Sequence, residues 1–392
     1  MKEVYLDYQS AKPVDPRVVE GMKPYFTEIF GNPSSLHHTG DVATEALEDS
    51  RKEIARFINA DPDEIIFTSG ATEAINMGLI GYAEKNKNKG KHIIISEIEH
   101  ISIRNIAKYL EREGFEVTSV PVDFYGRIDL NKLERRIRKD TILISVALAN
   151  NEIGTIQPIK EIGKLANENG IAFFSDAVAA EGLMPIDVKR DGIHLMALSS
   201  NDIYGPKGVG VLYMKKRYRI IPLTIGGGQE RGLRSGSENM HGIVGMKLAS
   251  EIMRKEMTGE VQRFKKYRDR MISTILDEVP DSHLNGHPEH RLANNVHVRF
   301  EGIEGEGILL SFKDDGVAVA TGSACTSKTL SASHTLIATG LLHEEAHGSL
   351  ELTVGRYTKD EDIDRVLEVT PGIVSKLRKM SPIYKPKMKV IS

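Results

Sequence analysis

The feature that most constrains this chain is an alternation, between residues 64 and 214, of short apolar runs with amphipathic segments. The amphipathic segments, such as 101–110 and 159–166, have the spacing of helices. The apolar runs are rich in β-branched residues and cover 65–67, 93–95, 142–146, 172–174 and 193–198. Strands that are apolar on both faces and joined by helical crossovers are typical of a mostly parallel sheet. The alternation therefore predicts an α/β lobe.

The rest of the chain has a different pattern. Asp15 and Pro16 form an N-cap followed by a proline, which predicts a first helix, and 43–57 is also predicted to be helical. A charged helical segment covers roughly 246–276, and strands are predicted beyond it at 295–300, 308–312 and 350–354, before a helical tail. Strands followed by helices predict a second, α+β lobe, which a chain of 392 residues is long enough to form.

Composition narrows the setting in which the protein works. Lys and Arg number 52 against 55 Asp and Glu, so the net charge of −3 gives no reason to expect nucleic acid or an anionic membrane as a partner. The N-terminal residues lack the apolar core of a signal peptide, and no uncharged run is long enough to span a bilayer. The one cysteine, Cys325, cannot form an internal disulfide. We expect a cytoplasmic protein.

Three polar residues follow predicted strands, where α/β sheets place their ligand-binding groups. Thr72 opens a helix, so its hydroxyl and the free backbone N–H groups can bind a phosphate, although an ordinary N-cap is the commoner explanation. Asp176 can hold a ring nitrogen protonated, or simply cap a turn. His100 can stack on a flat cofactor, although a solitary loop histidine is more often structural.

Two further segments carry reactive side chains. Cys325 lies among small polar residues, so it is a candidate nucleophile or metal ligand, although free cysteines are usually small core residues. Residues 343–347 match the H-E-x-x-H pattern of zinc peptidases, but that pattern needs one helix to orient both histidines. Gly340 and Gly348 bracket the segment and a strand is predicted after it, so a helix of that length is not expected. The peptidase interpretation is kept only as an alternative.

Seven stretches, in order along nearly the whole chain, resemble motifs of the cysteine desulfurases. These are fold-type-I pyridoxal-phosphate enzymes that take sulfur from cysteine and pass it on as a persulfide. The stretches are 5–8, 31–35, 68–73, 150–154, 203–208, 234–237 and 321–327. The resemblance implies an aminotransferase-like α/β fold, with a mostly parallel seven-stranded sheet in a large domain, 13–255. It also implies a small α+β domain, formed by 1–12 and 256–392, that carries Cys325.

The resemblance also implies roles for particular residues. Cys325 falls at the persulfide position, and its setting is similar to the branch of the family that serves iron-sulfur cluster assembly. Asn32, Asn151 and Arg356 are implied to bind the substrate L-cysteine. The residues implied to bind pyridoxal phosphate are Ala71, Thr72, His100, Asn151, Asp176, Ser199 and, from the other subunit of a homodimer, Ser237.

The chain departs from the family pattern where the cofactor is attached. Asn201 and Asp202 stand where the family has His and Lys, and Ala179 stands where it has a Gln that bonds the ring oxygen. A Schiff base needs an amine, which Asp202 cannot supply, and its carboxylate also repels the phosphate. The family pattern also has a lysine at the position of Lys207, in addition to the lysine that is missing here. This favours a structural role for Lys207. Lys12 replaces a Thr near the pocket, and we expect it to form an ion pair with Asp202.

We interpret the chain as a homodimeric family member in which pyridoxal-phosphate catalysis is impaired. It works with an iron-sulfur scaffold protein through Cys325, as a persulfide carrier or as a ligand of a shared [2Fe-2S] cluster. The alternative is an active desulfurase that binds the cofactor without covalent attachment and converts L-cysteine to L-alanine and a protein-bound persulfide.

Overall fold

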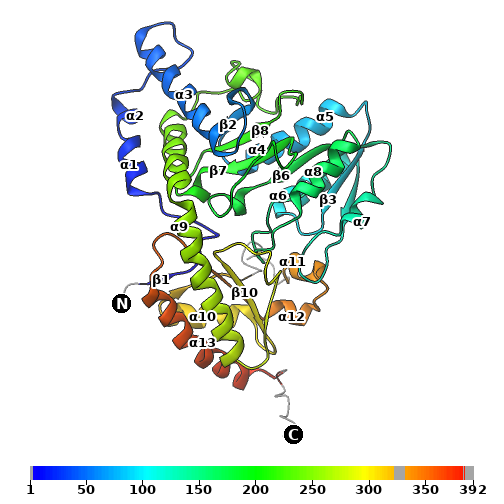
Figure 1. Cartoon of the computed structure of the whole chain (residues 1–392), viewed down its shortest axis with the longest axis vertical. Coiled ribbons are helices and arrows are strands. Elements are labelled where there is room, and N and C mark those ends of the chain that lie inside the picture. Colours follow the sequence, from blue (N-terminus) through cyan, green and yellow to red (C-terminus); the bar gives the residue numbers. More distant parts are fainter. Residues whose placement is uncertain (1–2, 322–331, 383, 385–392) are drawn as a thin grey trace.

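The computed structural model describes residues 3–321, 332–382 and 384, which form an upper lobe around a large sheet and a lower lobe around a small one (Figure 1). The large sheet has the strand order β2-β8-β7-β6-β5-β3-β4. Neighbours from β7 to β4 pair in parallel, whereas β8 is antiparallel to both β7 and β2. The predicted mostly parallel seven-stranded sheet is confirmed. Its strands are β2 Ile65–Thr68, β3 His92–Ser96, β4 Glu116–Val120, β5 Thr141–Ser145, β6 Ala172–Asp176, β7 Leu195–Ser199 and β8 Gly210–Met214.

Helices cover both faces of the large sheet. In β3, Ile94 belongs to the same buried cluster as side chains of α3, α8 and α9, whereas Ile93 and Ile95 belong to a second cluster with side chains of α4, α5 and α6. A strand covered on both faces has to be apolar at every position, which accounts for the unbroken apolar runs. The helices of this lobe are α3 His38–Phe57, α4 Ala71–Asn76, α5 Tyr82–Asn86, α6 Ile101–Arg112, α7 Leu130–Glu134, α8 Ile159–Glu168 and the first part of α9 Met240–Glu278.

Helix α9 links the two lobes (Figure 1). It contacts α1 (Pro16–Met22) and α3 in the upper lobe and α13 (Asp360–Met380) in the lower lobe. The short α2 (Pro24–Thr27) follows α1, whose N-cap Asp15 accepts a hydrogen bond from the Arg17 N–H, so the predicted first helix is confirmed. Because α9 passes residue 255 without a break, the expected domain boundary there stays a prediction.

The lower lobe contains a three-stranded antiparallel sheet in the order β12-β10-β9 and a parallel pair, β1 with β11. Strands β10 and β12 confirm the predictions for 295–300 and 350–354. The elements are β1 Val4–Tyr5, β9 Ser282–Leu284, β10 Asn295–Phe300, α10 Gly305–Asp314, β11 Val317–Ala318, α11 His334–Ala338, α12 His343–His347, β12 Ser349–Thr353 and α13. No helix in the described ranges is both long and apolar enough to cross a membrane.

The strand predicted at 308–312 is wrong, because these residues lie in helix α10. Ile308 and Phe312, four residues apart, are fully buried, whereas Leu310 between them is 56% exposed. A strand would have placed all three side chains on one face. An apolar run of this length does not distinguish a helix from a strand, and here burial on one helical face decides the outcome.

Candidate active site

A cavity of about 530 Å³ lies beyond the carboxyl ends of the parallel strands, between the two lobes. Its walls come from segments that follow β2, β3, β5, β6 and β7, and from residues next to β11, α11 and β12 in the lower lobe. Eight residues singled out from the sequence line it: Ala71, Thr72, His100, Asn151, Asp176, Ala179, Asn201 and Asp202. They meet because the carboxyl ends of parallel strands share one edge of the sheet.

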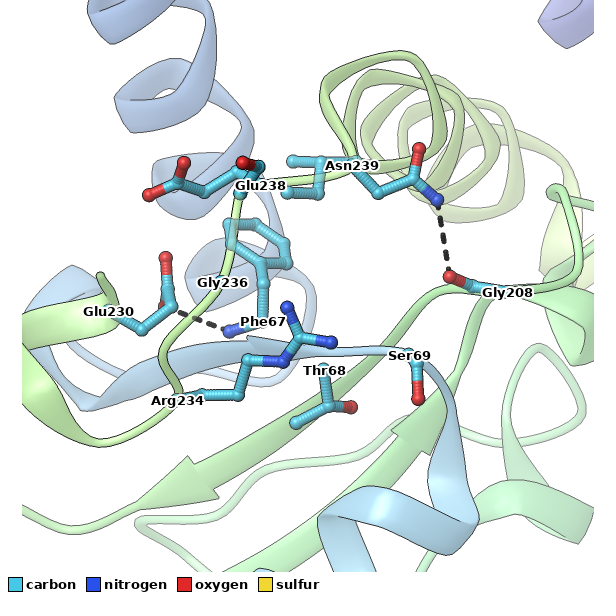
Figure 2. A pocket seen from close by; sticks show the side chains of 11 residues that line it. Phe67, Thr68, Ser69, Gly208, Glu230, Arg234, Gly236, Glu238 and Asn239 are labelled. Atoms are coloured by element: carbon cyan, nitrogen blue, oxygen red, sulfur yellow. Dashed lines mark hydrogen bonds between the residues drawn. The ribbon is translucent and has the colours of Figure 1, made fainter. Parts of the chain in front are cut away.

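Ser199, Asn32 and Ser237, which were also predicted to bind cofactor or substrate, do not line this cavity. Ser199 ends β7, and its backbone N–H donates to Glu181 Oε1 at 2.8 Å. Asn32 accepts a hydrogen bond from the Ser34 N–H within its own loop. Ser237 lines a separate hollow of about 250 Å³ next to the end of β2. Figure 2 shows this hollow, with Arg234 over the strand and Asn239 donating to the Gly208 carbonyl.

Helix α4 begins at the position predicted to bind a phosphate. Gly70, the N-cap, has φ +154°, and Thr68 at the end of β2 donates its hydroxyl to the Gly70 carbonyl. Glu73 reaches back to accept from the Ser69 N–H and also pairs with Arg234 at 2.9 Å. The turn is therefore held by local bonds, and Thr72 lines the cavity from the first turn of α4.

His100 and Asp176 face the cavity from neighbouring parts of the same sheet edge. His100 is the N-cap of α6, and its Nδ1 accepts from the Ser102 N–H, so it combines a capping role with lining the cavity. Asp176 accepts from the Val178 N–H at 3.0 Å. Burial raises the pKa of Asp176, and the nearby carboxylate of Asp202 raises it further.

The predicted ion pair between Lys12 and Asp202 is confirmed. Asp202 lies in a short 3-10 turn, Ser200–Ile203, directly after β7. Lys12 Nζ is 3.5 Å from Asp202 Oδ1 and donates to the Asp202 carbonyl at 2.6 Å. Both side chains are only 6% exposed.

A third buried ionisable residue, Glu181, was missed by the sequence reasoning. It is 1% exposed, one carboxylate oxygen accepts from the Ser199 N–H, and the other has no hydrogen-bond partner among the described residues. Burial raises the pKa of Glu181 well above its usual value, and the Asp202 carboxylate adds to the shift. The only sequence signal was an acidic residue set between apolar neighbours at 177–180 and 183–184.

Arg356 does not reach the cavity that it was expected to serve. Its guanidinium is 2.5 Å from Asp15 Oδ2 and 2.6 Å from Glu260 Oε1, and it lies over the Tyr204 ring, 4.6 Å from the centroid. Asp15 and Glu260 are both largely buried. The position of Arg356 in this structure therefore does not support a role in binding the substrate carboxylate.

Helix α6 contributes two lining residues that the sequence reasoning also missed. Arg104 and Lys108 follow His100 at intervals of four residues, so all three lie on one face of the helix. The opposite face, with Ile103, Ile106, Ala107 and Leu110, is buried. This spacing within the predicted helix 101–110 was the signal for both residues.

Several carboxyl groups beside the cavity are buried. Burial raises the pKa of Glu99 to about 8 and that of Glu152 to about 7. Glu351 is raised well above its usual value, first by burial and then by Glu152. Glu152 accepts a hydrogen bond from the Ser333 hydroxyl at 2.7 Å.

The segment 343–347 forms the short helix α12, which spans both histidines, contrary to the expectation that no helix there would be long enough to orient both. Its two histidine rings bond to each other, with His347 Nε2 3.1 Å from His343 Nδ1. Within the described ranges, no group of three or more His, Cys, Asp or Glu side chains is arranged to hold a metal ion. Cys325 lies outside the described residues. The nearest described residues on either side of its segment, Thr321 and Ala332, both line the cavity.

A mostly parallel seven-stranded sheet, a smaller second lobe and a polar cavity at the strand ends define the fold-type-I aminotransferase-like class. The family model described as Aminotransferase class-V matches residues 4–366. The chain is 56% identical over 381 residues to "Cysteine desulfurase IscS 1" of Archaeoglobus fulgidus, covering 97% of this chain and 99% of that protein. It is 52% identical over 382 residues to "Cysteine desulfurase IscS" of Methanosarcina thermophila, covering 97% and 94%.

Among solved structures, the chain is similar to a "NifS-like protein", with a TM-score of 0.89, 34% identity, and coverage of 96% of this chain and 100% of that one. The chain therefore belongs to the cysteine desulfurase family of class-V aminotransferases.

Pyridoxal phosphate is the cofactor expected of this family, and the cavity fits it in part. Thr72, His100 and Asp176 line the cavity with the groups that a phosphate, a ring and a ring nitrogen require. The position after β7 offers a carboxylate instead of an amine, and the Lys12 ammonium is already bound to Asp202. Of the lysines in the described part of the chain, Lys108 alone lines the cavity, exposed on α6. These residues therefore fit non-covalent binding of pyridoxal phosphate, and they do not fit covalent attachment of the cofactor at the position after β7.

Proposed function

We propose that this protein is a cytoplasmic, homodimeric component of iron-sulfur cluster assembly whose pyridoxal-phosphate chemistry is impaired. It acts with a scaffold protein through Cys325, as a persulfide carrier or as a ligand of a shared [2Fe-2S] cluster. The proposal is supported by the names of its relatives and carried by one observation, the carboxylate of Asp202 paired with Lys12 beside the cavity.

The charges around the cavity support impaired binding of an anionic cofactor. Asp202 adds a carboxylate next to Asp176 and Glu181, and the pKa values of both neighbours are raised, mainly by burial. A carboxyl group that retains its proton is a poor partner for a protonated ring nitrogen. Ala179 also leaves the ring oxygen without the donor that the family pattern supplies.

The first test asks whether the missing amine is the cause. Incubate wild type and Asp202→Lys with pyridoxal phosphate, reduce with borohydride, and locate the retained cofactor by peptide mass spectrometry. We expect label on residue 202 of the variant and none on wild type. Asp269→Lys, which adds a lysine at an exposed position of α9, controls for non-specific labelling.

Recovery in Asp202→Lys is expected to be partial, and adding Ala179→Gln should increase it. Label on Lys12, Lys108 or Lys207 of wild type would instead mean that the attachment site has moved. An unlabelled Asp202→Lys variant would mean that the cavity lacks more than the amine.

The second test concerns Cys325. A thiolate is a suitable ligand for an iron-sulfur cluster and a suitable carrier of sulfane sulfur. Co-purify the protein with its scaffold, as wild type and as Cys325→Ser, and measure cluster content and sensitivity to oxygen. We expect the variant complex to hold less cluster, and an unchanged cluster would count against the ligand role.

The alternative function is an active desulfurase, which family membership and the partly matching cavity favour. Incubation of wild type with L-cysteine and pyridoxal phosphate separates the two. Formation of L-alanine in excess of enzyme would establish the alternative, whereas our proposal expects no catalytic turnover.

A further inference from the structure

Arg356 is held away from the cavity by buried partners. Its side chain is 9% exposed and pairs with Asp15 and Glu260. Asp15 is the N-cap of α1 and Glu260 belongs to α9, so Arg356 joins α1, α9 and the loop before α13. Turning the guanidinium toward the cavity would leave two largely buried carboxylates without this partner, which is strongly unfavourable. In this chain Arg356 is a structural residue.

Arg104 is the arginine that faces the cavity. Its Nη1 donates to the Glu97 carbonyl at 2.8 Å, which orients the side chain, and its remaining N–H groups bond to none of the described residues. Burial and then Arg104 lower the pKa of the nearby His334, which disfavours a second positive charge on that ring. Lys108, one turn further along α6, also lines the cavity and is exposed.

The cavity therefore presents opposite charges on different elements. The cations Arg104 and Lys108 come from α6, whereas the carboxylate of Asp202 comes from the turn after β7. A zwitterionic α-amino acid carries one charge of each sign and matches this arrangement. A guanidinium with free N–H groups is well suited to a carboxylate, because it offers paired donors in one plane.

We propose that Arg104 binds the α-carboxylate of L-cysteine in this cavity, with Lys108 as a supporting charge, in the place of Arg356. This inference rests on the proposed function only in taking the main cavity as the cysteine site. It identifies a specificity-determining residue that comes from helix α6 and not from the loop that precedes α13.

The experiment compares two ligands that differ only in the carboxylate. Measure binding of L-cysteine and of cysteamine by calorimetry under reducing conditions, using the protein as purified. The variants are Arg104→Gln, Arg104→Lys, Lys108→Gln and Arg356→Gln, with Arg112→Gln as a control, because Arg112 is on α6 but does not line the cavity.

We expect Arg104→Gln to weaken L-cysteine binding by roughly tenfold or more and to leave cysteamine binding unchanged. Arg104→Lys should retain part of the affinity, and Lys108→Gln should cause a smaller loss that salt masks. Arg356→Gln should lower the thermal midpoint without changing the affinity of the folded protein for L-cysteine. Arg112→Gln should behave as wild type.

Three outcomes would overturn the inference. These are Arg104→Gln binding L-cysteine as wild type does, Arg356→Gln losing that binding instead, and wild type failing at millimolar concentration to prefer L-cysteine over cysteamine. Far-UV circular dichroism shows whether each variant is folded. The borohydride and cluster tests of the proposed function do not depend on Arg104. A negative result in the cysteine-binding experiment therefore leaves the proposed function standing, and a negative result in those two tests leaves the role of Arg104 intact.

Discussion

Replacing Lys12 with methionine isolates the charge that the structure places beside Asp202. Methionine keeps an unbranched side chain of similar length, but it loses the 3.5 Å contact with the Asp202 carboxylate and the 2.6 Å bond to its carbonyl. The Asp202 carboxylate then stays buried near Glu181 and Asp176 without its cation. We expect Lys12→Met to destabilise the fold substantially.

The magnitude follows from the burial and the geometry of the pair. Removing one partner of a buried ion pair costs about 3–5 kcal/mol. The distance of 3.5 Å is longer than a direct charged hydrogen bond, which favours the lower end, whereas the lost carbonyl bond adds to the cost. We therefore expect a loss of about 3 kcal/mol in the free energy of unfolding.

The loss should grow as the pH rises. Burial is the main cause of the raised pKa of Glu181, and the Lys12 ammonium opposes it, so Lys12→Met should raise that pKa further. A carboxyl group with a raised folded-state pKa retains a proton that the unfolded chain releases. Stability therefore falls as the pH increases from the unfolded pKa of a glutamate, about 4.3, toward the folded pKa.

The assay is urea unfolding followed by far-UV circular dichroism at fixed protein concentration, at pH 6 and pH 8. Lys23→Met is the matched control, because Lys23 pairs with Glu20 at 2.7 Å but both side chains are more than 60% exposed. It should cost no more than about 0.5 kcal/mol, and Lys12→Met/Asp202→Asn should recover most of the loss. A cost of Lys12→Met equal to that of Lys23→Met, at both pH values, would refute the reasoning.

Three further predictions follow from other sites. Burial raises the pKa of Glu99 to about 8, so wild type should lose stability between about pH 4.5 and 8. Glu99→Gln should remove this pH dependence of the free energy of unfolding. If urea unfolding gave the same pH dependence for wild type and variant, the prediction would be wrong. Arg51→Met should cost about 3–5 kcal/mol in the same assay, because it leaves the buried Glu230 without the guanidinium that bonds both of its oxygens, and a cost below 1 kcal/mol would be evidence against this. Light scattering at micromolar concentration should give twice the chain mass of 43.5 kDa, whereas a monodisperse monomer would exclude the proposed homodimer.

The large sheet was predictable because its signal is local. Strands such as β5 have three consecutive apolar residues and are buried at every position, and Asp15 followed by Pro16 marks the start of α1. The mistaken strand at 308–312 arose where a short apolar run fits two periods, and only packing against the lower-lobe core selects the helix. Local sequence patterns therefore predict long buried elements better than short half-exposed ones.

The cavity was predictable in part, for a related reason. Residues that follow parallel strands gather at one edge whatever their identity, so Thr72, His100 and Asp176 meet as expected. The partners of Arg356 come from distant parts of the chain, with Asp15 being 341 positions away, and no spacing in the sequence reveals such a contact. Arg104 has a local signal, since it lies one helical turn after His100.

The charges beside the cavity bear on what Asp202→Lys would do beyond supplying an amine. At present the Lys12 ammonium pairs with Asp202, and the Asp202 carboxylate adds to the raised pKa values of Glu181 and Asp176, which burial mainly causes. In Asp202→Lys, two ammonium groups would face two carboxyl groups, and the Asp202 charge that raises both pKa values would be gone. Asp176 would then ionise more readily, which is the state needed to bond a protonated ring nitrogen. One substitution should therefore restore two features of the cofactor site. Because Asp176 and Glu181 remain beside the new side chain as anionic partners once they ionise, we expect the variant to fold despite its second buried ammonium.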